Sequence, residues 1–92
     1  MSGAPVARRV VVHGRVQGVF FRESTRRRAE QAGVTGWIAN RGDGTVEALF
    51  EGAAADVRVL VDYVHRGPEG ASVERVEVFD VTPEGARSFQ TR

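Results

Sequence analysis

The sequence contains no cysteine, no lysine, a single tryptophan and no long apolar run. The absence of cysteine excludes disulfide bridges and thiolate metal ligands. No segment approaches the roughly 20 apolar residues of a membrane span or the core of a secretion signal, so we expect a soluble, cytoplasmic protein with no membrane partner. All 13 Lys or Arg side chains are arginine. The choice of arginine over lysine at one position therefore says nothing about its role, and only its place in the sequence does.

The length and composition fit one small globular domain. Of the 92 residues, 41% are hydrophobic and 27% are charged, which allows a modest core but not a second domain. We predict a flexible N-terminus at residues 1–5 and a single domain at residues 6–92. The net charge of only +1 gives little overall attraction to nucleic acid. We therefore expect no nucleic-acid partner and, since no apolar surface stripe is evident, a monomer.

The first third of the chain has the pattern of a strand followed by a helix. Residues 8–13 are a valine-rich run of strand length, and Gly14 is expected to end it. Residues 21–32 show helical spacing, and Gly33 is a typical stop signal. The side chains expected on the buried side of this helix are Phe21, Thr25, Ala29 and Ala32. Opposite charges four residues apart are expected on its solvated side, Glu23 with Arg27 and Arg26 with Glu30.

The rest of the chain predicts a hairpin, a second helix and further strands. Two β-prone runs at 35–40 and 45–51 flank an Asp-Gly dipeptide, which favours a hairpin turn. Residues 53–66 have the spacing of an amphipathic helix that a Gly-Pro pair ends. A strand is predicted at 73–81 and a short edge strand at 88–91.

This order of elements is β-α-β-β-α-β with a short extra C-terminal strand. It predicts an α+β, ferredoxin-like two-layer sandwich, in which two helices cover one face of an antiparallel sheet. Because each βαβ half crosses over with right-handed connectivity, the strands at 8–13 and 35–40 should run in the same direction. Their C-terminal ends then share one edge of the sheet, which brings the segment 14–22 close to Asn40.

The segment 14–22, which reads GRVQGVFFR, joins the first strand to the first helix. The N-terminus of a helix exposes unpaired main-chain N–H groups and carries a partial positive charge, so it binds anions readily. Gly14 and Gly18 permit a concave run of N–H groups, and Arg22 could donate two hydrogen bonds to the same anion. The alternative is an ordinary turn followed by a solvated arginine.

Two segments resemble the signatures of the acylphosphatase family, GRVQGVFFR at 14–22 and GWIANRGDGTVE at 36–47. The resemblance extends over nearly the whole chain. It implies an acylphosphatase-like sandwich and hydrolysis of the carboxyl-phosphate bond of a small acyl phosphate without a metal or cofactor. It also implies that Arg22 and a loop hold the phosphoryl group, at a place that phosphate or sulfate can occupy, while Asn40 positions the attacking water. The residues of that loop are Arg15, Val16, Gln17, Gly18, Val19 and Phe20.

Other chemically capable residues have simpler interpretations. His13 is expected on the uncovered side of the sheet and His65 near the C-terminus of the second helix, so neither is expected to be a catalytic acid or base. Asp43 is interpreted as a turn residue and Trp37 as a packing residue of its strand. Ser24 lacks a neighbouring base that would make it a nucleophile.

Three alternatives to a free-standing enzyme are open at this stage. Ferredoxin-like sheets also bind RNA through aromatic side chains on their open face. Here that face is expected to present Glu47, Leu49 and Glu51 to solvent, which is unfavourable for RNA. Acylphosphatase-like domains also occur inside larger proteins that process carbamoyl phosphate, and a third alternative is a regulatory fold without activity.

Overall fold

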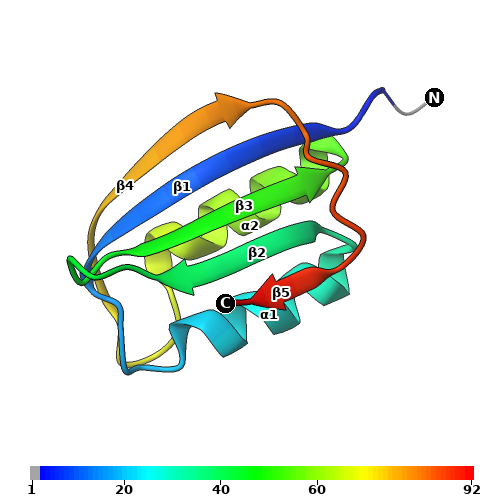
Figure 1. The fold of residues 1–92 in the computed structure, drawn as a ribbon. Helices are drawn as coiled ribbons and strands as arrows, with labels where there is room; N and C mark the ends of the chain where they lie inside the picture. Colours follow the sequence, from blue (N-terminus) through cyan, green and yellow to red (C-terminus); the bar gives the residue numbers. More distant parts are fainter. Residues whose placement is uncertain (1–2) are drawn as a thin grey trace.

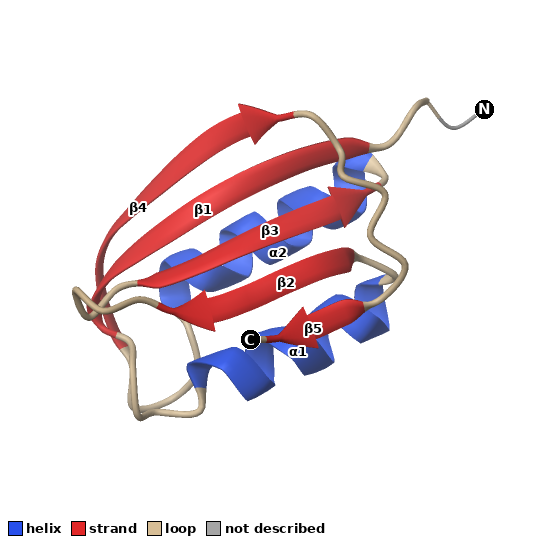
Figure 2. Cartoon of the chain, viewed as in Figure 1, coloured by secondary structure: helices blue, strands red, loops and turns tan. Residues whose placement is uncertain are grey.

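The computed structural model describes residues 3–92 and contains one sheet of five strands with both helices on the same face (Figure 1, Figure 2). The strands are ordered β4-β1-β3-β2-β5 across the sheet. This confirms the predicted ferredoxin-like α+β sandwich. The elements are β1 (Val6–Arg15), α1 (Phe21–Ala32), β2 (Thr35–Asn40), β3 (Val46–Gly52), α2 (Ala54–Arg66), β4 (Ser72–Val81) and β5 (Phe89–Thr91).

The prediction of an antiparallel sheet holds for β1 to β4 but not for β5, which pairs with β2 in parallel. The register places Val81, Glu51 and Thr35 at one end of the sheet. The chain leaves β4 at this end and crosses to the opposite edge through residues 82–88, as Figure 1 shows. Phe89 therefore starts β5 beside the beginning of β2, and the two strands run the same way.

The core lies between the helices and the covered face of the sheet. α1 buries Phe21, Thr25 and Ala29, in agreement with the predicted spacing, and its end is closed by Gly33 in a left-handed conformation. In α2 the buried side chains are Val57, Leu60, Tyr63 and Val64. Alternate residues of the strands complete this core, namely Val10, Val12, Ile38, Val46, Ala48 and Phe50.

Leu49 was predicted to face solvent, but this prediction is wrong, because its side chain is buried with 2% exposure. It does lie on the face away from the helices, directly opposite Arg9 on one side and Trp37 on the other. The guanidinium of Arg9 lies 4.5 Å from the ring centre of Phe79, and that of Arg92 lies 4.6 Å from the ring centre of Trp37. Arginine and aromatic side chains thus form a cross-strand row that covers Leu49 without a helix.

Glu51 was also expected in solvent, but its side chain is buried, with 4% exposure. Its carboxylate oxygens accept hydrogen bonds from the main-chain N–H groups of Glu84 (2.8 Å), Gly85 (3.0 Å) and Ala86 (3.2 Å). The loop before β5 thus folds over this end of β3, and the carboxylate satisfies its N–H groups. Glu47 alone of the predicted stripe remains partly open to solvent.

β1 continues past Gly14, which had been predicted to end it. The pairing of β1 with β4 has an irregularity between His13 and Gly14, and it then resumes with Gly14 opposite Val73. A Cβ atom at Gly14 would lie 2.2 Å from the main-chain oxygen of Ser72. The prediction that Gly14 ends the strand is therefore wrong, and the close approach of β4 at this irregularity requires a glycine here.

Two further expectations concern the flexibility of the N-terminal segment and the lack of a membrane-spanning segment. Of the predicted flexible residues 1–5, residues 1–2 lie outside the described part of the chain, and residues 3–5 are exposed and have no regular structure. Between residues 3 and 92, neither helix is long and apolar enough to cross a membrane.

Candidate active site

The C-terminal ends of β1 and β2 lie at the same end of the sheet, next to the N-terminus of α1 (left in Figure 1). This arrangement confirms that the segment 14–22 lies near Asn40. A cavity of about 390 Å³ opens there, which is within the range of small-molecule sites. The residues that line it are Val16, Gly18, Phe20, Phe21, Arg22, Glu23, Asn40 and Thr91.

The cavity brings together most of the predicted site residues, namely Val16, Gly18, Phe20, Arg22 and Asn40. Arg15, Gln17 and Val19 are not among its lining residues. Three lining residues had not been predicted. Phe21 is a core residue whose edge reaches the cavity, Glu23 belongs to the first turn of α1, and Thr91 comes from β5.

Two residues of the loop before α1 line the cavity in an unusual main-chain conformation. Gly18 has a φ of 74° and Phe20 a φ of 60°, so both are left-handed. Phe20 is the N-cap residue of α1 and makes no side-chain capping hydrogen bond. Its main-chain oxygen accepts the first helical bond from Ser24 at 3.0 Å, but the preceding N–H groups of the helix have no such partner within the helix. A bound anion would satisfy them.

Arg22 lies in the first turn of α1, and its side chain reaches β5. Its Nη1 donates a hydrogen bond of 3.0 Å to the main-chain oxygen of Arg92. A guanidinium group carries five N–H donors in a fixed plane, so this contact fixes its orientation and leaves other donors to reach an anion. β5 contributes Thr91 to the cavity wall, and Arg92, the residue after β5, makes this contact with Arg22.

Gln17 points away from the cavity and ties the loop to the β2–β3 hairpin. Its Nε2 donates to the main-chain oxygens of Arg41 (2.8 Å) and Thr45 (2.9 Å). Asp43 accepts hydrogen bonds from the Thr45 main-chain N–H (3.0 Å) and hydroxyl (2.6 Å), which confirms its interpretation as a turn residue. Asn40 is the last residue of β2, directly before the turn of this hairpin. The carboxamide of Gln17 therefore connects the loop before α1 with the segment that carries Asn40.

Glu23 places a carboxylate in the wall of a site that is expected to bind an anion. Its oxygens accept hydrogen bonds from Arg26 at 3.0 and 2.6 Å and from Arg27 at 3.1 Å. The hydrogen bond with Arg26 is the largest cause that lowers the pKa of Glu23 to about 2, against an opposing contribution from desolvation. The carboxylate is therefore charged at neutral pH, but neighbouring guanidinium groups balance it.

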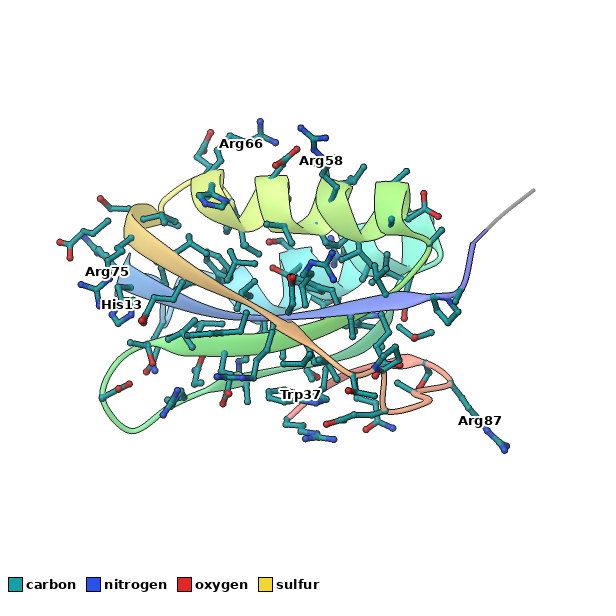
Figure 3. All side chains as sticks on the ribbon, turned by 90° about the horizontal axis from the view of Figure 1, so that it is seen from above. His13, Trp37, Arg58, Arg66, Arg75 and Arg87 are labelled. Atoms are coloured by element: carbon teal, nitrogen blue, oxygen red, sulfur yellow. The ribbon has the colours of Figure 1, made fainter. Side chains whose placement is uncertain are left out.

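The two histidines lie outside the cavity. His13 lies on the sheet near Arg75, as Figure 3 shows, and its Nε2 is 2.7 Å from a carboxylate oxygen of Glu77. His65 is in the last turn of α2, as predicted, with its Nδ1 2.8 Å from the main-chain oxygen of Val61.

An uncapped helix N-terminus, a glycine-containing loop, a guanidinium group and a carboxamide surround one cavity of a ferredoxin-like sandwich. The fold is that of a small α+β sandwich, and the groups around its cavity are of the kind that bind anions in proteins. The comparisons with known proteins identify the family. The family model described as Acylphosphatase matches residues 8–91. The chain belongs to the acylphosphatase family, and the protein is therefore a hydrolase that acts on acyl phosphates.

Individual relatives agree with this assignment over most of their length. The acylphosphatase of Acidovorax sp. (strain JS42) is 48% identical over 99% of this chain and 94% of its own. The acylphosphatase of Rubrobacter xylanophilus is 58% identical over 91% of this chain and 77% of its own. The solved structure of an acylphosphatase from Coxiella burnetii superimposes with a TM-score of 0.92 at 36% identity, covering 96% of this chain and 93% of that one.

Proposed function

We propose that this cavity hydrolyses the carboxyl-phosphate bond of acyl phosphates by direct attack of water. The main-chain N–H groups of the loop from Arg15 to Phe20 and the guanidinium of Arg22 hold the phosphoryl group. The side chain of Asn40 orients the attacking water. The observation that carries this proposal is that Arg22 and Asn40, from different elements, line the same cavity beside the N-terminus of α1.

The chemistry requires little beyond charge stabilisation and alignment. Water attacks phosphorus while the bond from phosphorus to the carboxyl oxygen breaks, which gives a carboxylate and inorganic phosphate. The carboxylate is a good leaving group, so the enzyme chiefly stabilises phosphoryl charge and aligns the water opposite the departing oxygen. A phosphoryl oxygen of the substrate accepts the proton of the water. Asn40 is uncharged and orients the water without acting as a base.

A covalent enzyme intermediate is not part of this mechanism. Ser24 is the hydroxyl-bearing residue closest in sequence to Arg22, but it does not line the cavity. Its hydroxyl group donates a hydrogen bond of 3.4 Å to the main-chain oxygen of Phe21, and its oxygen lies 2.7 Å from the Tyr63 hydroxyl oxygen. This hydrogen bonding joins α1 to α2 and leaves the serine without a base that would activate it.

The proposal also covers the anions that compete for the cavity, the oligomeric state and the cellular location. Inorganic phosphate or sulfate binds in the same cradle and competes with the substrate. The enzyme acts as a monomer in the cytoplasm. Light scattering of the purified protein measures its mass directly, and a dimer would contradict the monomer.

Paired substitutions at Arg22 and Asn40 test the division of roles. Arg22→Ala should lower turnover of benzoyl phosphate by a factor of about 10² or more and abolish competition by inorganic phosphate. Asn40→Ala should lower turnover strongly while phosphate still binds, because the water and not the anion loses its partner. Arg58→Ala, on the exposed side of α2, is the control for loss of one arginine. A folded Arg22→Ala protein with near-normal turnover, or equal loss of both functions in Asn40→Ala, would contradict these assignments.

A further inference from the structure

Phe20 is the most exposed large hydrophobic side chain in the described part of the chain. Its exposed fraction is 83%, compared with 45% for Val59, the next in order. The neighbouring Phe21 is 2% exposed and packs in the core. A phenyl ring in water loses the favourable free energy of burial, so Phe20 adds little to the stability of the core.

The main chain of Phe20 is also in an unfavourable conformation. It is the single residue other than glycine with a positive φ among the described residues, at φ 60° and ψ 25°. Glycine adopts this left-handed conformation without steric penalty, whereas a bulky side chain does not. Two unfavourable features thus coincide at one residue, and such coincidences occur where function requires them.

The position of Phe20 relates this strain to the substrate. Phe20 lines the cavity, next to the helix N-terminus at which the phosphoryl group is proposed to bind. The cavity of about 390 Å³ holds more than a phosphoryl group, so the acyl part of a substrate has space within it. On the solvent side of this cavity the exposed ring of Phe20 offers an apolar surface that an acyl group could contact.

We infer that Phe20 is a specificity-determining residue that contacts the acyl group and makes the enzyme prefer aromatic acyl phosphates over acetyl phosphate. This inference rests on the proposed function. An aromatic acyl group would cover the exposed ring and gain the extra attraction of an aromatic pair, which a methyl group cannot provide. The size of that attraction corresponds to about a 2- to 10-fold preference.

The test compares kcat/KM for benzoyl phosphate with kcat/KM for acetyl phosphate in each variant. The ratio of the two kcat/KM values is used because a disturbance of the phosphate loop changes both values by the same factor. Such a disturbance therefore leaves the ratio unchanged. Phe20→Asn keeps a residue that tolerates the left-handed conformation but removes the ring, so the ratio should fall by about 2- to 10-fold. Phe20→Leu keeps an apolar side chain and should give an intermediate ratio. Val59→Ala, on exposed α2, should leave the ratio unchanged.

A binding measurement separates recognition from chemistry. Phenacylphosphonate and acetonylphosphonate carry a methylene group in place of the bridging oxygen and are not hydrolysed. The aromatic analogue should inhibit the unaltered enzyme more strongly, and Phe20→Asn should remove that difference. Equal ratios in Phe20→Asn and the unaltered enzyme would overturn the inference, including the case in which Phe20 instead contacts another protein. The proposed function would survive that result, because it fails only if the unaltered enzyme is not inhibited by phosphate or does not depend on Arg22.

Discussion

The Nε2 of Gln17 donates a hydrogen bond of 2.9 Å to the main-chain oxygen of Thr45, which joins the loop before α1 to the hairpin after Asn40. The same nitrogen donates to the main-chain oxygen of Arg41 at 2.8 Å. The proposed phosphate cradle and the proposed water-orienting residue are thus held at a fixed separation by one side chain. A displacement of about 1 Å between reacting groups can lower a rate about 100-fold, so this connection matters for catalysis.

Gln17→Leu should therefore impair the enzyme although its side chain does not line the cavity. Leucine removes both hydrogen bonds, and the freed loop should bind phosphate more weakly and misplace the phosphoryl group. We expect kcat/KM to fall by about 10- to 100-fold, because catalysis is sensitive to small displacements of the reacting groups. Unfolding free energy should fall by about 1–3 kcal/mol for two neutral hydrogen bonds. Steady-state kinetics and urea unfolding measure these effects. Gln31→Leu, on the exposed side of α1, is the control, and unchanged kinetics in Gln17→Leu would refute the tether.

Glu51→Ala should destabilise the protein markedly. The substitution leaves the main-chain N–H groups of residues 84–86 without the carboxylate that accepts their hydrogen bonds. Hydrogen bonds to a charged group contribute about 1.5–3 kcal/mol each, but water reaches part of the opened loop, so we expect a loss of about 2–4 kcal/mol in urea unfolding. Glu47→Ala, four residues earlier on the same face, removes a more exposed ion pair and should lose less than about 1 kcal/mol. Equal losses would show that the loop is not held by Glu51.

Gly14→Ala should be far more harmful than Gly42→Ala. A Cβ atom at Gly14 meets the main-chain oxygen of Ser72, and the φ of 128° is one that alanine rarely adopts. Gly42 has no heavy atom within 4 Å of an added Cβ and no positive φ. We expect a loss of about 2 kcal/mol or more at Gly14, which corresponds to a melting temperature lower by roughly 10 °C. Calorimetry of both variants measures this, and similar melting temperatures would contradict the bulge assignment.

The pairing of Glu23 predicts an acid-dependent loss of stability. Its hydrogen bonds with Arg26 and then Arg27 lower its pKa from an ordinary value of 4.5 to about 2. Because the folded-state pKa is the lower one, the stabilisation is complete above about pH 4.5 and is lost as the pH falls toward 2. Glu23→Gln removes this contribution, so its melting temperature should approach that of the unaltered protein as the pH falls through this window.

Glu69→Gln, in the exposed loop between α2 and β4, is the control for the acid titration. Its melting temperature should follow that of the unaltered protein across the same range. Salt should reduce the effect at Glu23, because all its partners are partly exposed. A constant difference between Glu23→Gln and the unaltered protein down to about pH 2 would exclude Glu23 as the source.

Local patterns predicted the elements well because they depend on neighbouring residues. The helix at 21–32 matches α1 residue for residue, and Gly33 ends it as expected. The Asp-Gly signal correctly placed the β2–β3 hairpin. The crossover rule then placed Asn40 beside the loop before α1, so the two parts of the candidate site could be brought together without coordinates.

The predicted solvent exposure was wrong where segments distant in sequence cover a face of the sheet. Alternation along β3 gave the correct face for Leu49 and Glu51 but the wrong exposure, because side chains from other strands and the loop at 82–88 cover that face. Thr91 was missed because a strand of three residues carries no periodic signal that would give its neighbour or direction. The orientation of Gln17 toward the hairpin likewise depends on a chain reversal that sequence spacing does not specify.

The sequence by itself determined the order and length of the elements, the turn chemistry and the group of residues that gather at one edge of the sheet. Only the tertiary structure decided which faces are covered, that β5 runs parallel to β2, that Arg92 after β5 contacts Arg22, and that Phe20 stands exposed beside the cavity. The physical reason is that helical and strand periodicities are local properties of the main chain, whereas burial and side-chain partners depend on segments that meet only after the sheet has formed.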